Sequence, residues 1–389
     1  MAAEQRCYVI FSALFAPSMG GVENYTQCLA RELRRDGSRV IVVTSMLGDE
    51  PAREVNADGV EVVRLPATVL LKGRLPISRR NADYRRLWGY LSSVRADYVL
   101  VNTRFYRHSL EGLRYARDKG ITPILIEHGS AHLTLGNAVF DRALALYEHA
   151  ITGLVKRGRP LFYGVSEKSN RWLEHFGIRA EGVLKNAIDA PEFRALASAR
   201  DFLTESGIGG DAFVVGYAGR LTPEKGIASL METADLLQEE EGIHFLVAGS
   251  GSCESLASDA KRRNVTFLGR LDKADLSALL SQLDMFCLPS RSEGFATVLL
   301  ESGAWGVPFA ATDVGGVDEL VEGRDSKLLL ASASPDEIAD AIKYARDNRE
   351  EMRCVGRRLR EHVENECTWL STASSVRSAC ANAMVPSSS

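Results

Sequence analysis

Short apolar runs alternate with helical patterns in two separate series, and this alternation limits the chain to few folds. In the first series the apolar runs lie at residues 8–14, 40–44, 60–65, 98–101, 124–127 and 162–166. Helical patterns separate them, for example at Val22–Arg35, where apolar residues share one face and Gly37 follows a basic last turn, and at Asp141–Val155. Strands separated by helices form parallel sheets. The first series therefore predicts an α/β domain.

A second series starts at Val214–Ala218 and predicts a second α/β domain. Its further strands are expected at residues 244–248, 265–268, 285–288, 307–311 and 326–330, and its helices at 226–238, 253–263, 273–282 and 335–347. A length of 389 residues is typical of two domains. Strand signals are missing between Asn186 and Phe213. We therefore expect Rossmann-like domains at residues 1–186 and 187–365, and a C-terminal helix with a frayed tail at 366–389.

The composition is typical of a soluble globular protein, with 45% hydrophobic and 25% charged residues. The chain contains no apolar run long enough for a transmembrane helix, and the first apolar segment, Cys7–Leu14, is too short for a signal peptide. The seven cysteines are scattered and show no Cys-x-x-Cys spacing, as is typical of reduced thiols. These features predict a cytoplasmic protein.

Charge is distributed unevenly along the chain. Residues 1–185 carry a net charge of +8, whereas the remainder carries −12. Phosphate binding, an anionic membrane surface and chance composition could each explain this difference. Residues 72–86 hold six cations and one anion, interleaved with Leu75, Ile77 and Tyr84. This segment is either an amphipathic surface that docks on anionic lipid or a loop whose arginines pair with acids and whose aromatic residues are core.

Two carboxylates, Glu293 and Glu301, stand eight residues apart in the segment Ser290–Glu301. The apolar run Leu283–Pro289 precedes this segment and predicts a buried parallel strand, and a helix is expected to follow the Gly294 turn. Free N–H groups at the start of such a helix suit a phosphate. A carboxylate would repel a phosphate but can accept hydrogen bonds from sugar or ribose hydroxyls. The segment therefore predicts a site for a nucleotide diphosphate that carries a sugar.

This segment resembles the Glu-x7-Glu motif of the retaining glycosyltransferases of the GT-B fold, family 4. Other segments match in the same order, namely Gly20–Glu23, Glu127–Gly129, Val165–Glu167, Asn186–Asp189 and Ala218–Gly226. The resemblance implies an α/β GT-B fold, in which two Rossmann-like doubly wound domains face each other across a cleft and a C-terminal helix crosses back. It also implies sugar transfer, with retention, from a UDP- or GDP-sugar to an acceptor hydroxyl in polysaccharide, glycolipid or cell-envelope glycan synthesis.

The resemblance further implies roles for individual residues. The expected catalytic residues are His128, Arg220, Lys225 and Glu293. Donor binding is expected of these last three and of Gly21, Arg270, Gly294, Phe295, Ala296, Thr297 and Glu301. Gly20 and Gly21 are expected to bind the acceptor, and Ser166 and Asn186 to line the cleft. The residues themselves also favour a phosphate role for Arg220 and Lys225, because two cations five residues apart near a helix start can bind a pyrophosphate from both sides.

No metal or cofactor is expected. The chain contains no Asp-x-Asp, and no His or Cys cluster has the spacing of a metal site. Protein cations are therefore expected to stabilise the leaving diphosphate. The expected partners are a nucleotide sugar, a glycan or lipid-linked acceptor and, on the inner face of the membrane, an anionic lipid surface, but no nucleic acid. Two other functions remain as alternatives to a glycosyltransferase: a catalytically silent sugar-nucleotide-binding subunit and a GT-B sugar-nucleotide epimerase.

Overall fold

The computed structural model describes residues 5–18, 20–70, 75–132, 138–240, 242–259, 262–321 and 328–384. It divides into two compact units. Unit 1 comprises residues 1–186 and 369–389, and unit 2 comprises residues 187–368. Within the described residues, no helix is long and apolar enough to cross a bilayer.

Unit 1 is built on a mainly parallel sheet. Its strands lie in the order β3 (Arg53–Val55), β4 (Glu61–Leu70), β2 (Arg39–Met46), β1 (Cys7–Phe11), β6 (Tyr98–Asn102), β7 (Ile124–Glu127), β8 (Leu161–Gly164) and β9 (Gly182–Val183). β5 (Leu75–Ser78) also pairs with β4, and both β3 and β5 run antiparallel to it. The six strands expected from the sequence are present, and the three short strands β3, β5 and β9 were not predicted.

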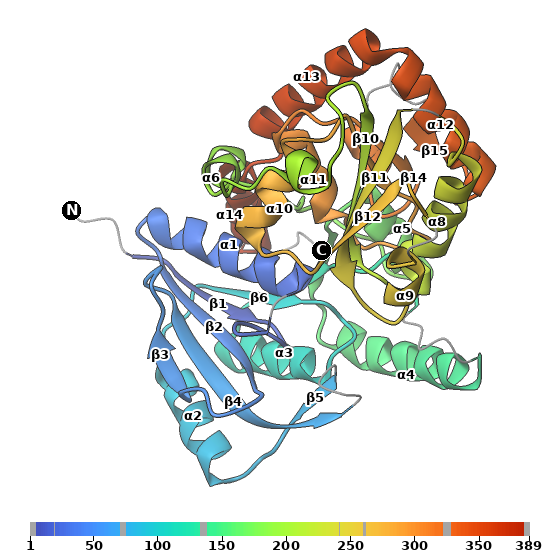
Figure 1. Ribbon diagram of the computed structural model, residues 1–389. Coiled ribbons are helices and arrows are strands. Elements are labelled where there is room, and N and C mark those ends of the chain that lie inside the picture. The colour runs from blue at the N-terminus through green and yellow to red at the C-terminus, as the bar shows by residue number, and fades with distance from the viewer. Residues whose placement is uncertain are drawn as a thin grey trace. The chain divides into compact units, whose positions relative to one another are not determined.

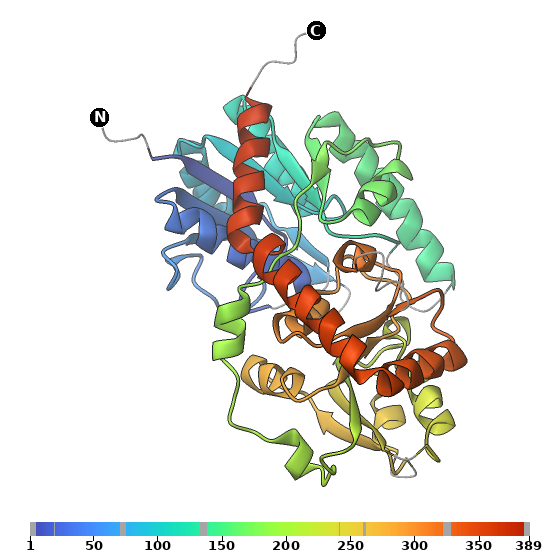
Figure 2. The same cartoon turned by 90° about the horizontal axis from the view of Figure 1, so that it is seen from above.

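Helices cover both faces of the unit 1 sheet. One face packs against α2 (Ala82–Ser93), α3 (Arg107–Lys119), α4 (Ala138–Arg157) and α5 (Glu167–Glu174) in one apolar cluster. α1 (Gly21–Arg35) and α14 (Trp369–Ala383) contact each other, and they also contact β2 and β7, respectively. Figure 2 shows α14, in red, lying along the sheet of unit 1. Unit 1 therefore contains both the first strand, β1, and the last helix, α14.

The basic segment at residues 72–86 forms β5 and the start of α2. Tyr84 and Leu87 are buried in the core, and Tyr84 stacks on Trp88 with ring centroids 5.7 Å apart. Tyr84 therefore fits the second of the two alternatives, a core aromatic residue, because the period of α2 directs it to the sheet. Arg79 and Arg85 are exposed. Residues 71–74 lie outside the described part of the chain.

Unit 2 has a fully parallel sheet. Its strands lie in the order β12 (Val265–Gly269), β11 (Ile243–Ser250), β10 (Phe213–Arg220), β13 (Met285–Leu288), β14 (Phe309–Thr312) and β15 (Leu329–Leu330). Figure 1 shows one side covered by α8 (Ile227–Leu236), α9 (Glu254–Ala257) and α12 (Pro335–Asp347). The other side carries α6 (Ala190–Ala195), α10 (Lys273–Leu280), α11 (Thr297–Ala304) and α13 (Arg349–Glu366). The short helix α7 (Phe202–Glu205) follows α6 in the chain. One continuous apolar core joins these layers.

Three helices of unit 2 differ from the prediction. α8 begins at Ile227 because Gly226 adopts a left-handed conformation with φ of +72°, which ends the preceding 3-10 turn, η1 (Pro223–Lys225). α9 spans only Glu254–Ala257 of the helix expected at 253–263, of which residues 260–261 are not described. α13 was not predicted, although its buried residues recur at helical spacing.

Both sheets reverse their strand order at one point. In unit 2 the chain passes outward from β10 through β11 to β12 and then returns to β13 on the other side of β10. In unit 1 the same reversal lies between β1 and β6. Ligands bind at the carboxyl ends of the strands beside such a switch point. A ligand site is therefore expected at the loops after β10 and β13 in unit 2, and at the loops after β1, β6 and β7 in unit 1.

Candidate active site

A buried ion pair joins the two loops at the switch point of unit 2. Lys225 follows β10 and Glu293 follows β13, and the Lys225 Nζ lies 2.6 Å from both carboxylate oxygens of Glu293. The side chains are only 17% and 9% exposed. The Ser290 hydroxyl donates to Glu293 Oε1 at 2.8 Å. The pair makes the carboxylate compatible with a neighbouring phosphate, because Lys225 offsets its negative charge.

Two glycines allow the loops to approach one another. At Gly226 a Cβ would lie 1.9 Å from the carbonyl oxygen of Pro289, so only glycine lets η1 contact the loop after β13. Gly315, in the loop after β14, has φ of +56°, and a Cβ there would lie 2.6 Å from Glu293 Cβ. The backbone N–H of Arg291 donates to the Glu224 carbonyl at 2.8 Å. The loops after β10, β13 and β14 thus form one packed support for Glu293.

The N-terminus of α11 lies directly after Glu293 and Gly294. Its N-cap residue, Ala296, provides no side-chain cap. Among the described residues no backbone partner is recorded for the N–H groups of Phe295 and Ala296, as expected of groups that could bind a phosphate. Thr297 differs from the prediction, because its N–H donates to the Phe295 carbonyl at 3.1 Å.

The two expected arginines are exposed at the ends of β10 and β12, which lie on either side of β11. Arg220 is the last residue of β10, and Arg270 directly follows β12. The structure records no ion pair for either guanidinium among the described residues, whereas Lys225 is paired. The buried Tyr217 hydroxyl donates to the Arg220 carbonyl at 3.1 Å and so holds the backbone of the loop. Arg220 can thus reach a ligand without first breaking an ion pair.

Glu301 lies on α11, two turns beyond Glu293. The residue is half-buried, and burial raises the pKa of its carboxyl to about 7, while the charge of Lys273 opposes this rise. An ordinary glutamate is fully ionised at neutral pH. The raised pKa therefore indicates a carboxylate that lacks hydrogen-bond donors, which two adjacent ribose hydroxyls would supply.

The glycine pair of unit 1 lies at the start of α1, on the loop after β1. Gly20 is the N-cap residue and no side chain caps this helix. A Cβ on Gly20 would lie 2.5 Å from the Glu23 carboxylate, whereas the space around Gly21 is open. Burial raises the pKa of Glu23, whose side chain folds back over Gly20. An open helix start beside a glycine allows close approach of a ligand.

His128, after β7, is held in one tautomer by a chain of hydrogen bonds. The Thr26 hydroxyl donates to the Val22 carbonyl at 2.7 Å, so its oxygen accepts the hydrogen bond of Asn102 Nδ2 at 2.7 Å. Asn102 Oδ1 then faces His128 Nε2 at 3.1 Å. Nε2 must therefore carry the proton, which leaves Nδ1 as an acceptor. Burial lowers the pKa of His128 to about 3, so the ring is neutral.

Ser166 and Asn186 were expected to line a cleft. The Ser166 hydroxyl is buried and caps α5 by accepting the N–H of Ser169 at 3.2 Å. Asn186 is buried at the last position of the first segment of unit 1. Ser166 therefore has a structural role as a helix cap, which the Ser-Glu sequence at a helix start could have indicated.

Several residues of these sites were not predicted. Asn102 ends an apolar strand, and a polar residue at the carboxyl end of a strand at a switch point was a usable signal. The Gly315–Gly316 pair after β14 was another. Three histidines that are distant in the sequence, His132, His149 and His175, come together with their ligand nitrogens within 4.8 Å of one another. Their spacing in the sequence is not that of a metal site, and only the fold brings these three side chains together.

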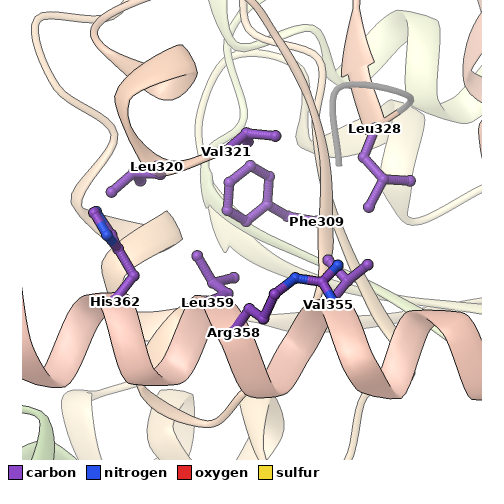
Figure 3. Close-up of a pocket in the computed structure, with 8 residues that line it drawn as sticks. All are labelled: Phe309, Leu320, Val321, Leu328, Val355, Arg358, Leu359 and His362. Atoms are coloured by element: carbon purple, nitrogen blue, oxygen red, sulfur yellow. The ribbon is translucent and has the colours of Figure 1, made fainter. Parts of the chain in front are cut away.

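A small apolar pocket lies elsewhere in unit 2. Figure 3 shows its lining, which comes from β14, η2 (Val317–Leu320) and α13 with neighbouring residues: Phe309, Leu320, Val321, Leu328, Val355, Arg358, Leu359 and His362. None of these residues belongs to the loops after β10 and β13. The pocket is therefore separate from Lys225, Glu293 and the start of α11.

Comparison with known proteins agrees with this geometry. Residues 19–190 match the family model described as Glycosyltransferase Family 4, and residues 199–362 match Glycosyl transferases group 1. A D-inositol 3-phosphate glycosyltransferase of Saccharomonospora viridis is 28% identical over 382 residues, covering 89% of this chain and 85% of the relative. A GDP-mannose-dependent alpha-mannosyltransferase of Mycolicibacterium smegmatis is 26% identical over 347 residues, covering 82% and 83%.

A solved structure shows the same fold. Anabaena Alr3699/HepE, in complex with UDP and glucose, superposes with a TM-score of 0.71 at 18% identity, covering 97% of this chain and 100% of that one. The two family models together span most of the chain, from the glycine pair of α1 to α13. The chain is therefore a member of the group 1 glycosyltransferases of the GT-B fold, as its motifs had indicated.

Proposed function

We propose that this glycosyltransferase transfers a sugar from a UDP- or GDP-sugar to an acceptor hydroxyl with retention of the anomeric configuration. One observation carries the proposal. The Lys225–Glu293 pair lies at the switch point of unit 2, beside the open N-terminus of α11. A cation and helix N–H groups suit a diphosphate, and a carboxylate suits sugar hydroxyls. Both kinds of group lie in the loops after β10 and β13, which pack against each other.

In the proposed reaction the bond between the anomeric carbon and the diphosphate oxygen breaks, and a bond to the acceptor oxygen forms on the same face. The acceptor proton passes to the leaving phosphate. Lys225, Arg220 and the N–H groups of α11 stabilise the negative charge that develops on the diphosphate. Glu293 is held by Lys225 and Ser290, so it orients the sugar rather than attacking it. This argues against a double displacement through a glycosyl-enzyme.

His128 has a binding role in this proposal. Its neutral ring, with the proton on Nε2 directed at Asn102, cannot supply a positive charge near neutral pH. The ring also packs edge-on against Tyr25, with centroids 4.8 Å apart. His128 therefore contributes shape and hydrogen bonding to the donor sugar and does not act as a general acid.

The proposed transfer needs no metal ion, because protein cations and helix N–H groups carry the phosphate charge. Turnover should survive EDTA. Complete loss of turnover, restored by Mg²⁺ or Mn²⁺, would refute metal independence. Partial stimulation by these ions would not, because free cations can assist release of the nucleotide.

The acceptor is proposed to be a glycan or a lipid-linked glycan at the inner face of the membrane. The exposed cations of the segment at residues 72–86, such as Arg79 and Arg85, support this, although its aromatic residues are core. Binding to lipid would then be electrostatic, with each cation contributing about 1 kcal/mol at most. Flotation with anionic liposomes should fall with salt and with the exchange of Arg79, Arg80, Arg85 and Arg86 for Ser. No flotation at low salt would favour a soluble acceptor.

A donor panel tests the proposal. The relatives use or were crystallised with different nucleotides, so both UDP- and GDP-sugars belong in it. Thermal shift identifies a tight donor, because a ligand that binds the folded state raises the unfolding temperature. Nucleotide release that depends on an acceptor supports transfer. Conversion of the sugar without an acceptor would indicate an epimerase, and binding without any turnover a silent subunit.

A further inference from the structure

The three histidines of unit 1 form a site that the proposed transfer reaction does not use. His149 lies on α4, His175 is the C-cap residue of α5, and His132 follows the loop of His128. Their ligand nitrogens lie within 4.8 Å of one another. His149 and His175 are exposed, and the His132 side chain is 33% exposed. A solute can thus reach the cluster.

A carboxylate already orients one of these rings. Glu148 Oε2 lies 2.5 Å from His132 Nδ1, so Nδ1 carries the proton and His132 Nε2 remains as the ligand atom. Metal-binding histidines almost always donate their second ring N–H to such a partner, which fixes the ring and raises its basicity. Trp172 fixes a second ring, because it stacks on His175 at 4.9 Å with an interplanar angle of 5°. Two of the three ligands are therefore already oriented.

The charge beneath the cluster also favours a cation. Arg104 lies between Glu127 and Glu148 at 3.1 and 2.7 Å, and all three side chains are at most 5% exposed. The Glu148 carboxylate thus contacts Arg104 on its buried side and His132 on the side of the cluster. A buried carboxylate is stabilised by nearby positive charge. A cation on His132 would add such charge next to Glu148.

We infer that His132, His149 and His175 bind a divalent transition-metal ion, with Zn²⁺ the best match. Imidazole nitrogen is a preferred ligand of Zn²⁺, and three protein ligands with one open position form a common zinc geometry. Tetrahedral binding requires the three nitrogens to lie about 3.4 Å apart. The exposed ring of His149, which is the least constrained of the three, can turn inward to meet this distance.

The ion would connect α4 with the end of α5 and with the loop after β7. From His132 the contacts continue through Glu148 and Arg104 to Glu127, whose Oε1 accepts the N–H of Gly129 at 2.8 Å. Gly129 is the neighbour of His128. The inferred role is therefore structural, at a site distinct from the phosphate-binding groups of unit 2.

Zinc titration of the full-length protein, without a polyhistidine tag and after removal of metal by EDTA and dialysis, tests the inference. Calorimetry should show one Zn²⁺ bound per chain with micromolar or tighter affinity. His149→Ala and His175→Ala should each weaken binding at least tenfold, and both variants should fold because these side chains are exposed. His244→Ala is the matched control, because His244 lies in unit 2 and contacts Thr266.

Cobalt provides a second measurement. Co²⁺ in the wild type should give the intense visible absorption of a tetrahedral site, and the double variant of His149 and His175 should lose it. Equal Zn²⁺ binding by the wild type and the double variant would identify an adventitious site only and overturn the inference. Absence of binding at micromolar Zn²⁺ would also overturn it.

Discussion

Replacing Glu301 with glutamine should raise the stability of unit 2 and weaken nucleotide binding at the same time. Burial raises the pKa of this carboxyl from 4.5 to about 7. The folded state therefore binds the proton more tightly than the unfolded state does. Below pH 4.5 both states are protonated and the group has no effect. As the pH rises from 4.5 to 7 the unfolded state ionises first, so the stability falls. Above pH 7 both states are ionised, and the full loss of stability remains.

The size of this loss of stability follows from the shift in the pKa of Glu301. One pKa unit corresponds to about 1.4 kcal/mol, so the change from 4.5 to about 7 corresponds to about 3 kcal/mol. Glu301 is only half-buried, and contact with solvent reduces the cost to about 2 kcal/mol. Glu301→Gln should therefore raise the unfolding temperature of unit 2 by roughly 4–8 °C at pH 8 and by almost nothing at pH 4.5.

The assay compares unfolding of the wild type and Glu301→Gln between pH 4.5 and pH 8. Glu232→Gln is the matched control, because Glu232 is exposed on α8 of the same unit. Titration with UDP and with GDP on the same samples should show binding weakened by roughly 10–100-fold in Glu301→Gln, the scale of one lost hydrogen bond to a charged group. A stability difference that does not change with pH would refute the burial argument. Unchanged nucleotide affinity would refute the ribose role.

Three further predictions concern the remaining site residues. Arg220→Ala and Lys225→Ala should each lower kcat by roughly 10²–10³, the scale of one lost group that stabilises transition-state charge, but only Lys225→Ala should also lower stability, because it removes the cation that pairs with the buried Glu293. Gly315→Ala should lower both turnover and stability, since its φ of +56° and the 2.6 Å approach to Glu293 exclude a Cβ. His128→Gln should lower kcat without changing the shape of the pH profile between pH 5 and 8, because the pKa of His128 is about 3.

Each of these predictions has a control or a result that would contradict it. Gly210→Ala is the control for the glycine variant, because nothing lies within 4 Å of a Cβ at that position. Equal stability of the Lys225 and Arg220 variants would mean that the ion pair does not matter for folding. Loss of a pH-dependent step near pH 6.5 in His128→Gln would mean that the histidine titrates during turnover.

Most of the fold could be predicted from the pattern of apolar residues along the chain. Buried parallel strands such as Val40–Thr44 are continuous apolar runs, so their positions follow from the sequence directly. Short edge strands such as β3 and β5 have no such signal, because one edge or face is exposed and few residues are needed to form them. The start of α8 was missed by one residue for a local reason, the left-handed Gly226.

The site could be predicted only where function depends on residues close in the sequence. Glu293 and Glu301 lie on one loop and one helix, so their spacing was visible. The partner of Glu293 is Lys225, which lies 68 positions away in the sequence, and only the adjacency of β10 and β13 brings the two together. The sequence alone predicts a ligand for each residue and not their contact with each other. Under the proposed function, the donor would bind to an ion pair that is already formed.

That ion pair explains how a carboxylate can lie beside a phosphate site. Glu293 alone would repel the diphosphate, and Lys225 alone would bind any anion. Paired, they present a site with no net charge, in which the third ammonium proton of Lys225 can still be donated to a phosphate. Under the proposed function, the sugar hydroxyls approach a carboxylate whose position is set by Lys225, Ser290 and the contact with Gly315. A nucleotide sugar should then bind more tightly than the free nucleotide, because its sugar adds hydroxyls that can reach Glu293.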